Sequence, residues 1–75
     1  MTQAELDQLV ARINATDDGE PGFQGAYIEK YAPPTIGIDF TDNATAEQYV
    51  FRKEIGDVKS MSVDPANGSR VLWRR

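Results

Sequence analysis

The sequence predicts a small α+β domain in which two helices cover one face of a four-stranded, mostly antiparallel sheet. Three observations support this prediction. An apolar stripe with helical spacing opens the chain, two strand patterns joined by prolines follow, and a second helix pattern precedes a second hairpin pattern. The order helix–strand–strand–helix–strand–strand folds most simply as a two-layer sandwich. The length of 75 residues predicts one domain, residues 1–75.

Residues 3–15 are predicted to form an amphipathic helix. Thr2 and Glu5 match a capping box, in which each side chain accepts a hydrogen bond from the other residue's backbone N–H. The apolar residues that follow form one stripe: Leu6, Leu9, Val10 and Ile13. The stripe favours burial in a core, and a partner-binding helix face is the alternative.

Residues 14–22 are predicted to form a loop, because turn-forming residues are dense there. Its acids, Asp17, Asp18 and Glu20, raise the question of calcium binding. Their spacing does not match an EF-hand loop, which needs alternating ligands and a distal glutamate. We therefore expect a solvated loop and no metal site.

The stretch from Gly22 to Thr41 is predicted to form the central hairpin. Its second strand alternates and places its apolar residues on one face: Ile36, Ile38 and Phe40. The first strand is apolar on both parities, which indicates a central strand or a bulge at Gly25. Pro33 and Pro34 cannot donate to a strand ladder, so a wide loop is expected there.

Residues 44–55 are predicted to form a second helix, with Asp42 or Asn43 as its N-cap and Gly56 just after its end. The buried stripe is expected to contain Ala46, Tyr49 and Val50, with Phe51 and Ile55 on its shoulder. A strand through residues 49–51 is the alternative, because these residue types favour sheets.

The C-terminal part is predicted to form a second antiparallel hairpin, with strands at residues 58–63 and 70–74. The connecting segment, residues 64–69, contains Pro65 and Gly68, and we expect the glycine in the left-handed region. Each strand has two apolar residues of the same parity: Met61 and Val63 in the first, and Val71 and Trp73 in the second.

Composition excludes several kinds of chemistry. The chain has no cysteine and no histidine, so Ser-His-Asp or Cys-His catalysis and the usual zinc, haem and iron–sulfur ligand sets cannot form within it. Asp39 and Asp42 are a conceivable acid/base pair, but a chain of this size is not expected to build the cleft they need. We expect no enzyme activity and no cofactor.

The net charge and the hydropathy of the sequence limit the binding partners and the cellular compartment that we expect for this protein. The net charge is −4, which is unfavourable for binding a phosphate backbone. The sequence contains no run of about 18 apolar residues, so we expect no membrane span. The N-terminus lacks the pattern of a signal peptide. We expect a cytoplasmic protein if the chain is full length; for a domain of a longer protein the compartment stays open.

Two segments resemble known protein families. Phe23-Gln-Gly-Ala-Tyr-Ile-Glu29 and Ile36-Gly-Ile-Asp-Phe-Thr-Asp42, followed by a helix, resemble the pro-domains of secreted bacterial serine proteases of the streptogrisin and α-lytic type. Ser62-Val-Asp-Pro-Ala-Asn-Gly-Ser-Arg-Val-Leu72 is similar to the last strands of PepSY-type domains. Both resemblances imply a non-enzymatic domain that binds a peptidase as a folding template or an inhibitor.

The sequence therefore favours a non-catalytic module that binds another protein, with a peptidase as one candidate partner, through an exposed sheet surface or edge. The expected contact residues are Tyr27, Tyr31, Arg70 and Trp73. Nucleic-acid binding is the first alternative, with the three aromatic rings as a stacking platform beside basic residues of the C-terminal hairpin. A structural or self-associating domain, including a homodimer through an edge strand, is the second.

Overall fold

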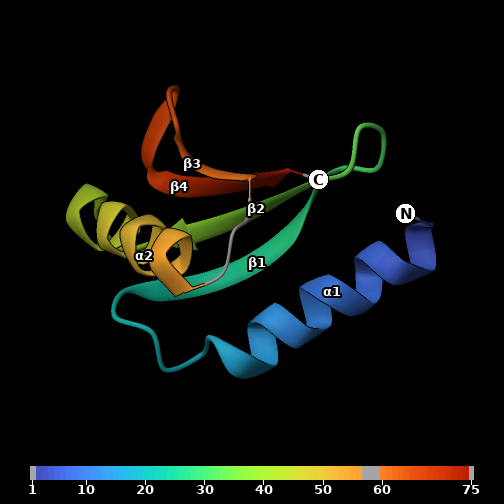
Figure 1. Ribbon diagram of the computed structural model, residues 1–75, viewed down its shortest axis with the longest axis horizontal. Coiled ribbons are helices and arrows are strands. Elements are labelled where there is room, and N and C mark those ends of the chain that lie inside the picture. Colours follow the sequence, from blue (N-terminus) through green and yellow to red (C-terminus); the bar gives the residue numbers. More distant parts are fainter. Residues whose placement is uncertain (1, 57–59, 75) are drawn as a thin grey trace.

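The computed structural model describes residues 2–56 and 60–74 and confirms the α+β architecture. The elements follow in the order α1 (Gln3–Thr16), β1 (Phe23–Lys30), β2 (Thr35–Phe40), α2 (Asn43–Gly56), β3 (Ser60–Asp64) and β4 (Asn67–Arg74). The four strands form one antiparallel sheet in the order β1-β2-β4-β3 (Figure 1). Neither α1 nor α2, as far as residues 2–56 and 60–74 describe them, has the length and hydrophobicity of a membrane-spanning helix.

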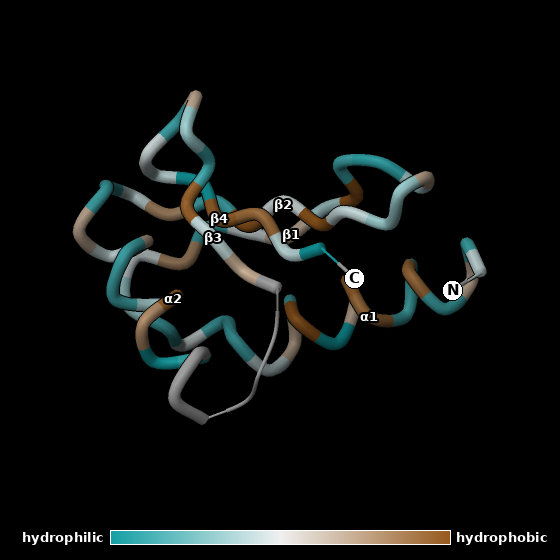
Figure 2. The backbone as a smooth tube through the Cα atoms, turned by 45° about the horizontal axis from the view of Figure 1, so that its top comes forward, coloured by the Kyte–Doolittle hydropathy of each residue, from teal (hydrophilic) through white to brown (hydrophobic). Residues whose placement is uncertain are grey.

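The core lies between the sheet and the two helices. Register places Ile36 beside Ile28 and Trp73, and Ile38 beside Ala26 and Val71. These side chains share one face and meet apolar residues of both helices: Leu6 and Ile13 of α1, and Ala46 and Tyr49 of α2. Figure 2 shows the hydrophobic stretches of β2 and β4 side by side at the centre of the molecule. The predicted parity of Met61 with Val63 and of Val71 with Trp73 is confirmed.

The central hairpin has the predicted form. The register shifts between Phe23 and Gly25, which confirms a bulge at this point of β1. A second irregularity lies between Ile28 and Lys30. Residues 31–34 connect the strands, so the prolines lie in a wide loop as expected.

The predicted N-terminus of α1 is confirmed. Thr2 N–H donates to Glu5 Oε1 at 2.9 Å, and Glu5 N–H donates to Thr2 Oγ1 at 3.1 Å. Leu6 and Ile13 are buried, and Leu9 and Val10 pack against the core.

The helical interpretation of the second helix is also confirmed, and α2 extends through Gly56. Asp42 is its N-cap, because Thr45 N–H donates to Asp42 Oδ1 at 2.8 Å. One expectation was wrong: Phe51 is 65% exposed. It follows the buried Tyr49 by two positions, which places it about 200° around the helix and away from the sheet. The side chain of Ile55 lies outside the described residues.

The connection between β3 and β4 differs from the prediction. β4 begins at Asn67, so Asn67, Gly68 and Ser69 belong to the strand, and Gly68 does not have a positive φ. Asn67 Oδ1 accepts hydrogen bonds from Ser69 N–H at 3.2 Å and Ser69 Oγ at 2.8 Å, which holds an irregular start of the strand. A Cβ on Gly68 would lie 2.8 Å from Asn43 Nδ2, so the glycine allows α2 to approach closely. Predicted strand residues 58 and 59 lie outside the described residues.

The expectation of a solvated loop after α1 was wrong for Asp17. This residue is 7% exposed, and its Oδ2 accepts a hydrogen bond from Tyr49 Oη at 2.6 Å. Lys53 Nζ lies 3.5 Å from Asp17 Oδ1. Burial, followed by the hydrogen bond to Asp17, raises the pKa of Tyr49, so its hydroxyl stays protonated and donates. This contact joins the end of α1 to the middle of α2.

Replacing Tyr49 with Phe should lower the free energy of unfolding by about 2 kcal/mol, the usual cost of losing a hydrogen bond to a charged group. The ring is retained, but the buried Asp17 carboxylate loses its shortest contact. Urea unfolding measures the change. Tyr31→Phe is the matched control, because its hydroxyl donates to Asp7 at an exposed position, and it should leave the free energy of unfolding nearly unchanged. Equal losses in the two variants would contradict a special role for the buried contact.

The cap of α2 predicts a pH dependence of stability. The backbone N–H and hydroxyl of Thr45 hold the pKa of Asp42 below its ordinary 3.8. The stabilisation from the ionised cap is therefore fully present above pH 3.8 and is lost as the pH falls through the lower pKa of the folded protein. Asp42→Asn keeps a capping oxygen but does not titrate. The difference in urea midpoint between the wild type and this variant should shrink as the pH drops below 3.8, and a constant difference would refute the linkage.

Candidate functional site

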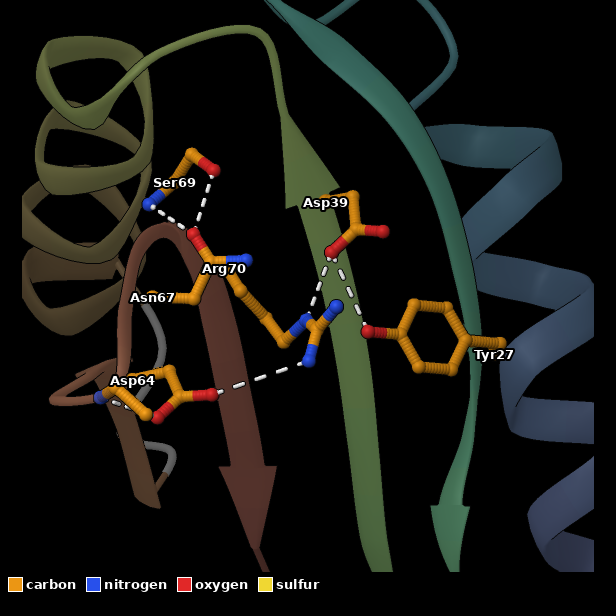
Figure 3. A network of polar contacts seen from close by, with 7 residues as sticks. Tyr27, Asp39, Asp64, Asn67, Ser69 and Arg70 are labelled. Atoms are coloured by element: carbon orange, nitrogen blue, oxygen red, sulfur yellow. Dashed lines mark hydrogen bonds and ion pairs between the residues drawn. The ribbon is translucent and has the colours of Figure 1, made fainter.

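The sheet has an open face, which is the side turned away from α1 and α2. Tyr27, Asp39, Asp64 and Arg70 come from β1, β2, β3 and β4 in turn, and Figure 3 shows them pointing toward one another across the sheet. Tyr27 and Asp39 alternate with members of the core cluster on their strands, and Arg70 precedes the core residue Val71. Asp39 is directly opposite Arg70 in the register. We refer to these four residues as the open-face network.

The open-face network is centred on the pairing of Arg70 with Asp39. Arg70 Nε donates to Asp39 Oδ1 at 2.9 Å, and Tyr27 Oη donates to the same oxygen at 3.3 Å. Arg70 Nη1 lies 4.0 Å from Asp64 Oδ2. The Arg70 guanidinium carbon is 5.5 Å from the centre of the Tyr27 ring, within the range of a cation–π interaction. Each member therefore has its orientation set by another member.

Gly37 provides the space that Tyr27 occupies. The two residues are paired in the β1–β2 register, and a Cβ on Gly37 would lie 2.6–2.7 Å from Tyr27 ring and hydroxyl atoms. The ring therefore lies directly over the backbone of β2. The network requires glycine at position 37, because any larger residue there would displace the Tyr27 ring.

The electrostatics keep Tyr27 and Arg70 protonated near neutral pH. Burial, followed by the charge of Asp39, raises the pKa of Tyr27, so the phenol remains a donor. The hydrogen bond to Asp39 raises the pKa of Arg70, which stays charged. The arrangement therefore offers hydrogen bonds, a ring and fixed charges, which suit recognition of another molecule.

The other two predicted contact residues lie elsewhere, which corrects the expectation of one surface. Trp73 is 6% exposed and packs in the core on the helix-facing side. Tyr31 is 45% exposed in the loop after β1, and its hydroxyl donates to Asp7 Oδ1 on α1 at 3.0 Å. Tyr27 and Arg70 do lie together. The three aromatic side chains thus do not form the stacking platform that the nucleic-acid alternative requires.

Sequence reasoning missed the acidic members of the network. Asp39 was weighed only as a possible acid/base partner of Asp42, whereas Asp39 binds Arg70 and Asp42 caps α2. Asp64 was treated as a turn residue, and its Oδ1 does accept Ala66 N–H at 2.9 Å. The available signal was parity, because Asp39 alternates with the core residues Ile38 and Phe40.

A cavity of about 140 Å³ lies on the helix side of the sheet. Its apolar lining includes Leu9, Ile13, Met61 and Trp73. Two of its charged groups already contact each other, since Lys53 pairs with Asp17 and lies 5.5 Å from the centre of the Tyr49 ring. Among the described residues, no group of three or more acidic side chains is arranged to hold a metal ion.

No family model, curated protein or solved structure matches this chain.

Gly37→Ala should displace the Tyr27 ring and lower the free energy of unfolding by about 1–3 kcal/mol, the usual cost of overpacking. In a Tyr27→Ala background the added methyl group has room, so the same substitution should cost clearly less. Urea unfolding of the four proteins in this double-mutant cycle measures the coupling. Equal costs of Gly37→Ala in both backgrounds would refute the contact between the two residues.

Proposed function

We propose that this domain is a non-catalytic module that binds another protein through the open face of its sheet, with Tyr27 and Arg70 as the principal contact residues. The observation that supports this proposal is the open-face network itself. Neither helix covers it, and its side chains are held by one another. Arg70 and Asp39 retain exposed side-chain fractions of 29% and 38%, so a partner can reach them.

The composition of the network supports protein recognition. Tyrosine and arginine are enriched among the residues that dominate binding energy in protein–protein interfaces. Side chains already fixed in the free protein lose less conformational entropy on binding. The contacts of Tyr27 with Gly37 and of Arg70 with Asp39 supply this fixation.

The charges of the network indicate the chemistry of the partner. Two carboxylates, Asp39 and Asp64, face one guanidinium, Arg70, and the whole chain carries a net charge of −4. A partner surface with a basic side chain at its centre would complement this excess of negative charge. The resemblance to protease pro-domains makes a peptidase the first partner class to test. The net negative charge and the separation of the aromatic residues are both unfavourable for nucleic-acid binding.

Affinity capture with the immobilised domain tests the proposal. The wild type should enrich a specific protein from the lysate or culture supernatant of its source. Tyr27→Ala and Arg70→Ala should each reduce recovery of that protein about tenfold or more, as expected for residues at the centre of an interface. Where the captured protein is a peptidase, its hydrolysis of a standard substrate in the presence of the domain shows whether the domain inhibits it.

Phe51→Ala is the matched control, because Phe51 is the most exposed large apolar residue described and lies on α2. Recovery should be unchanged in this variant. Loss of the captured protein with Phe51→Ala alone would move the binding surface to α2 and overturn the open-face proposal. Circular dichroism of each variant verifies that the fold is intact.

A further inference from the structure

The two edges of the sheet are built differently. At the β1 edge, the side-chain amide of Asn14 on α1 forms hydrogen bonds with both the backbone N–H and the backbone carbonyl of Ala26. Asn14 Nδ2 donates to Ala26 O at 3.0 Å, and Ala26 N–H donates to Asn14 Oδ1 at 2.9 Å. The amide thus takes the place of a residue in a neighbouring strand. An added strand at this edge would have to displace both hydrogen bonds.

At the β3 edge, no described side chain makes hydrogen bonds like those of Asn14. Within the described residues β3 has one strand neighbour, β4, so the backbone groups on its other side point outward. Natural edge strands are commonly protected by charged side chains, especially lysine, by proline or by a bulge. Residues 60–64 contain neither lysine nor proline. Their charged residue, Asp64, and the register shift between Val63 and Asp64 both lie at the end of the strand. β3 is therefore able to accept a further strand.

We propose that β3 pairs antiparallel with β3 of a second copy of this chain, around a twofold axis at Ser62. This register places Ser62 opposite Ser62 of the second copy, and Met61 opposite Val63 of the second copy. Met61 and Val63 are half-buried and share the helix-facing side of β3. Each apolar side chain would thereby cover its counterpart, and the two sheets would become one continuous sheet.

Charge does not oppose this register. Asp64 is the charged residue of β3, and it falls opposite position 60 of the second copy. The two Asp64 positions would lie four residues apart along the strands, about 13 Å, where salt screens their repulsion. The contact is short, so the dimer should be weak and concentration-dependent. It uses the edge of β3, whereas the proposed partner site uses the open face, so either proposal can fail without the other.

Sedimentation velocity of the wild type over a wide range of concentrations tests the dimer. Ser62→Lys would place two lysines directly opposite each other at the twofold axis and should weaken dimerisation roughly fivefold, and Ser62→Asp should act similarly. Ser62 is exposed, so both substitutions should leave the fold intact. The lysine variant has a smaller net negative charge than the wild type, so general charge repulsion alone would predict the opposite result.

An equimolar mixture of the lysine and aspartate variants should restore association, because opposite charges then meet at the axis. Gln24→Lys is the matched control: it adds the same charge at an exposed position on β1 and should dimerise at least as well as the wild type. A wild type that stays monomeric throughout, an unaffected Ser62→Lys variant, a control that weakens equally, or a mixture without restored association would each overturn this register.

Discussion

β2 is hydrogen-bonded on both sides, to β1 and to β4, and its two-residue alternation decides which side of the sheet becomes core. Ile36, Ile38 and Phe40 turn toward the helices, and the neighbouring strands must present apolar residues on the same side. The intervening residues, Gly37 and Asp39, therefore lie on the open face. Both the core and the candidate site thus follow from this central strand, because a slip of one residue would exchange its two faces.

Two polar contacts, in addition to the apolar core, connect the segment after α1 to α2. The buried hydrogen bond from Tyr49 to Asp17 and the more exposed ion pair of Arg52 with Glu20, at 2.7 Å, both connect the segment after α1 to α2. The buried contact should matter more, because exposed ion pairs contribute little in water, whereas an unpaired buried carboxylate is costly. A small sheet with one covered face depends on such links to hold both helices in place.

The surfaces proposed for binding are distinct in chemistry. The open-face network is polar and is held by its own contacts, so it suits a partner that supplies complementary charge. The β3 edge offers backbone groups and two half-buried apolar residues, so it suits an extended strand. On the opposite edge, the Asn14 side chain hydrogen-bonds the backbone of Ala26, so the two edges differ in how they could receive a further strand.

The sequence by itself determined the features that depend on neighbouring residues: the capping box of α1, the alternation of β2, the bulge near Gly25 and the loop at the prolines. Local hydrogen bonds and steric limits act within a few residues and are visible in the sequence. Only the tertiary structure decided the burial of Asp17 and the separation of Trp73 from Tyr27. Residues 39 and 70 are likewise far apart in the chain but face each other in the sheet. These outcomes depend on how strands align and which helix covers which face, and that is set by packing of the whole chain rather than by any local pattern.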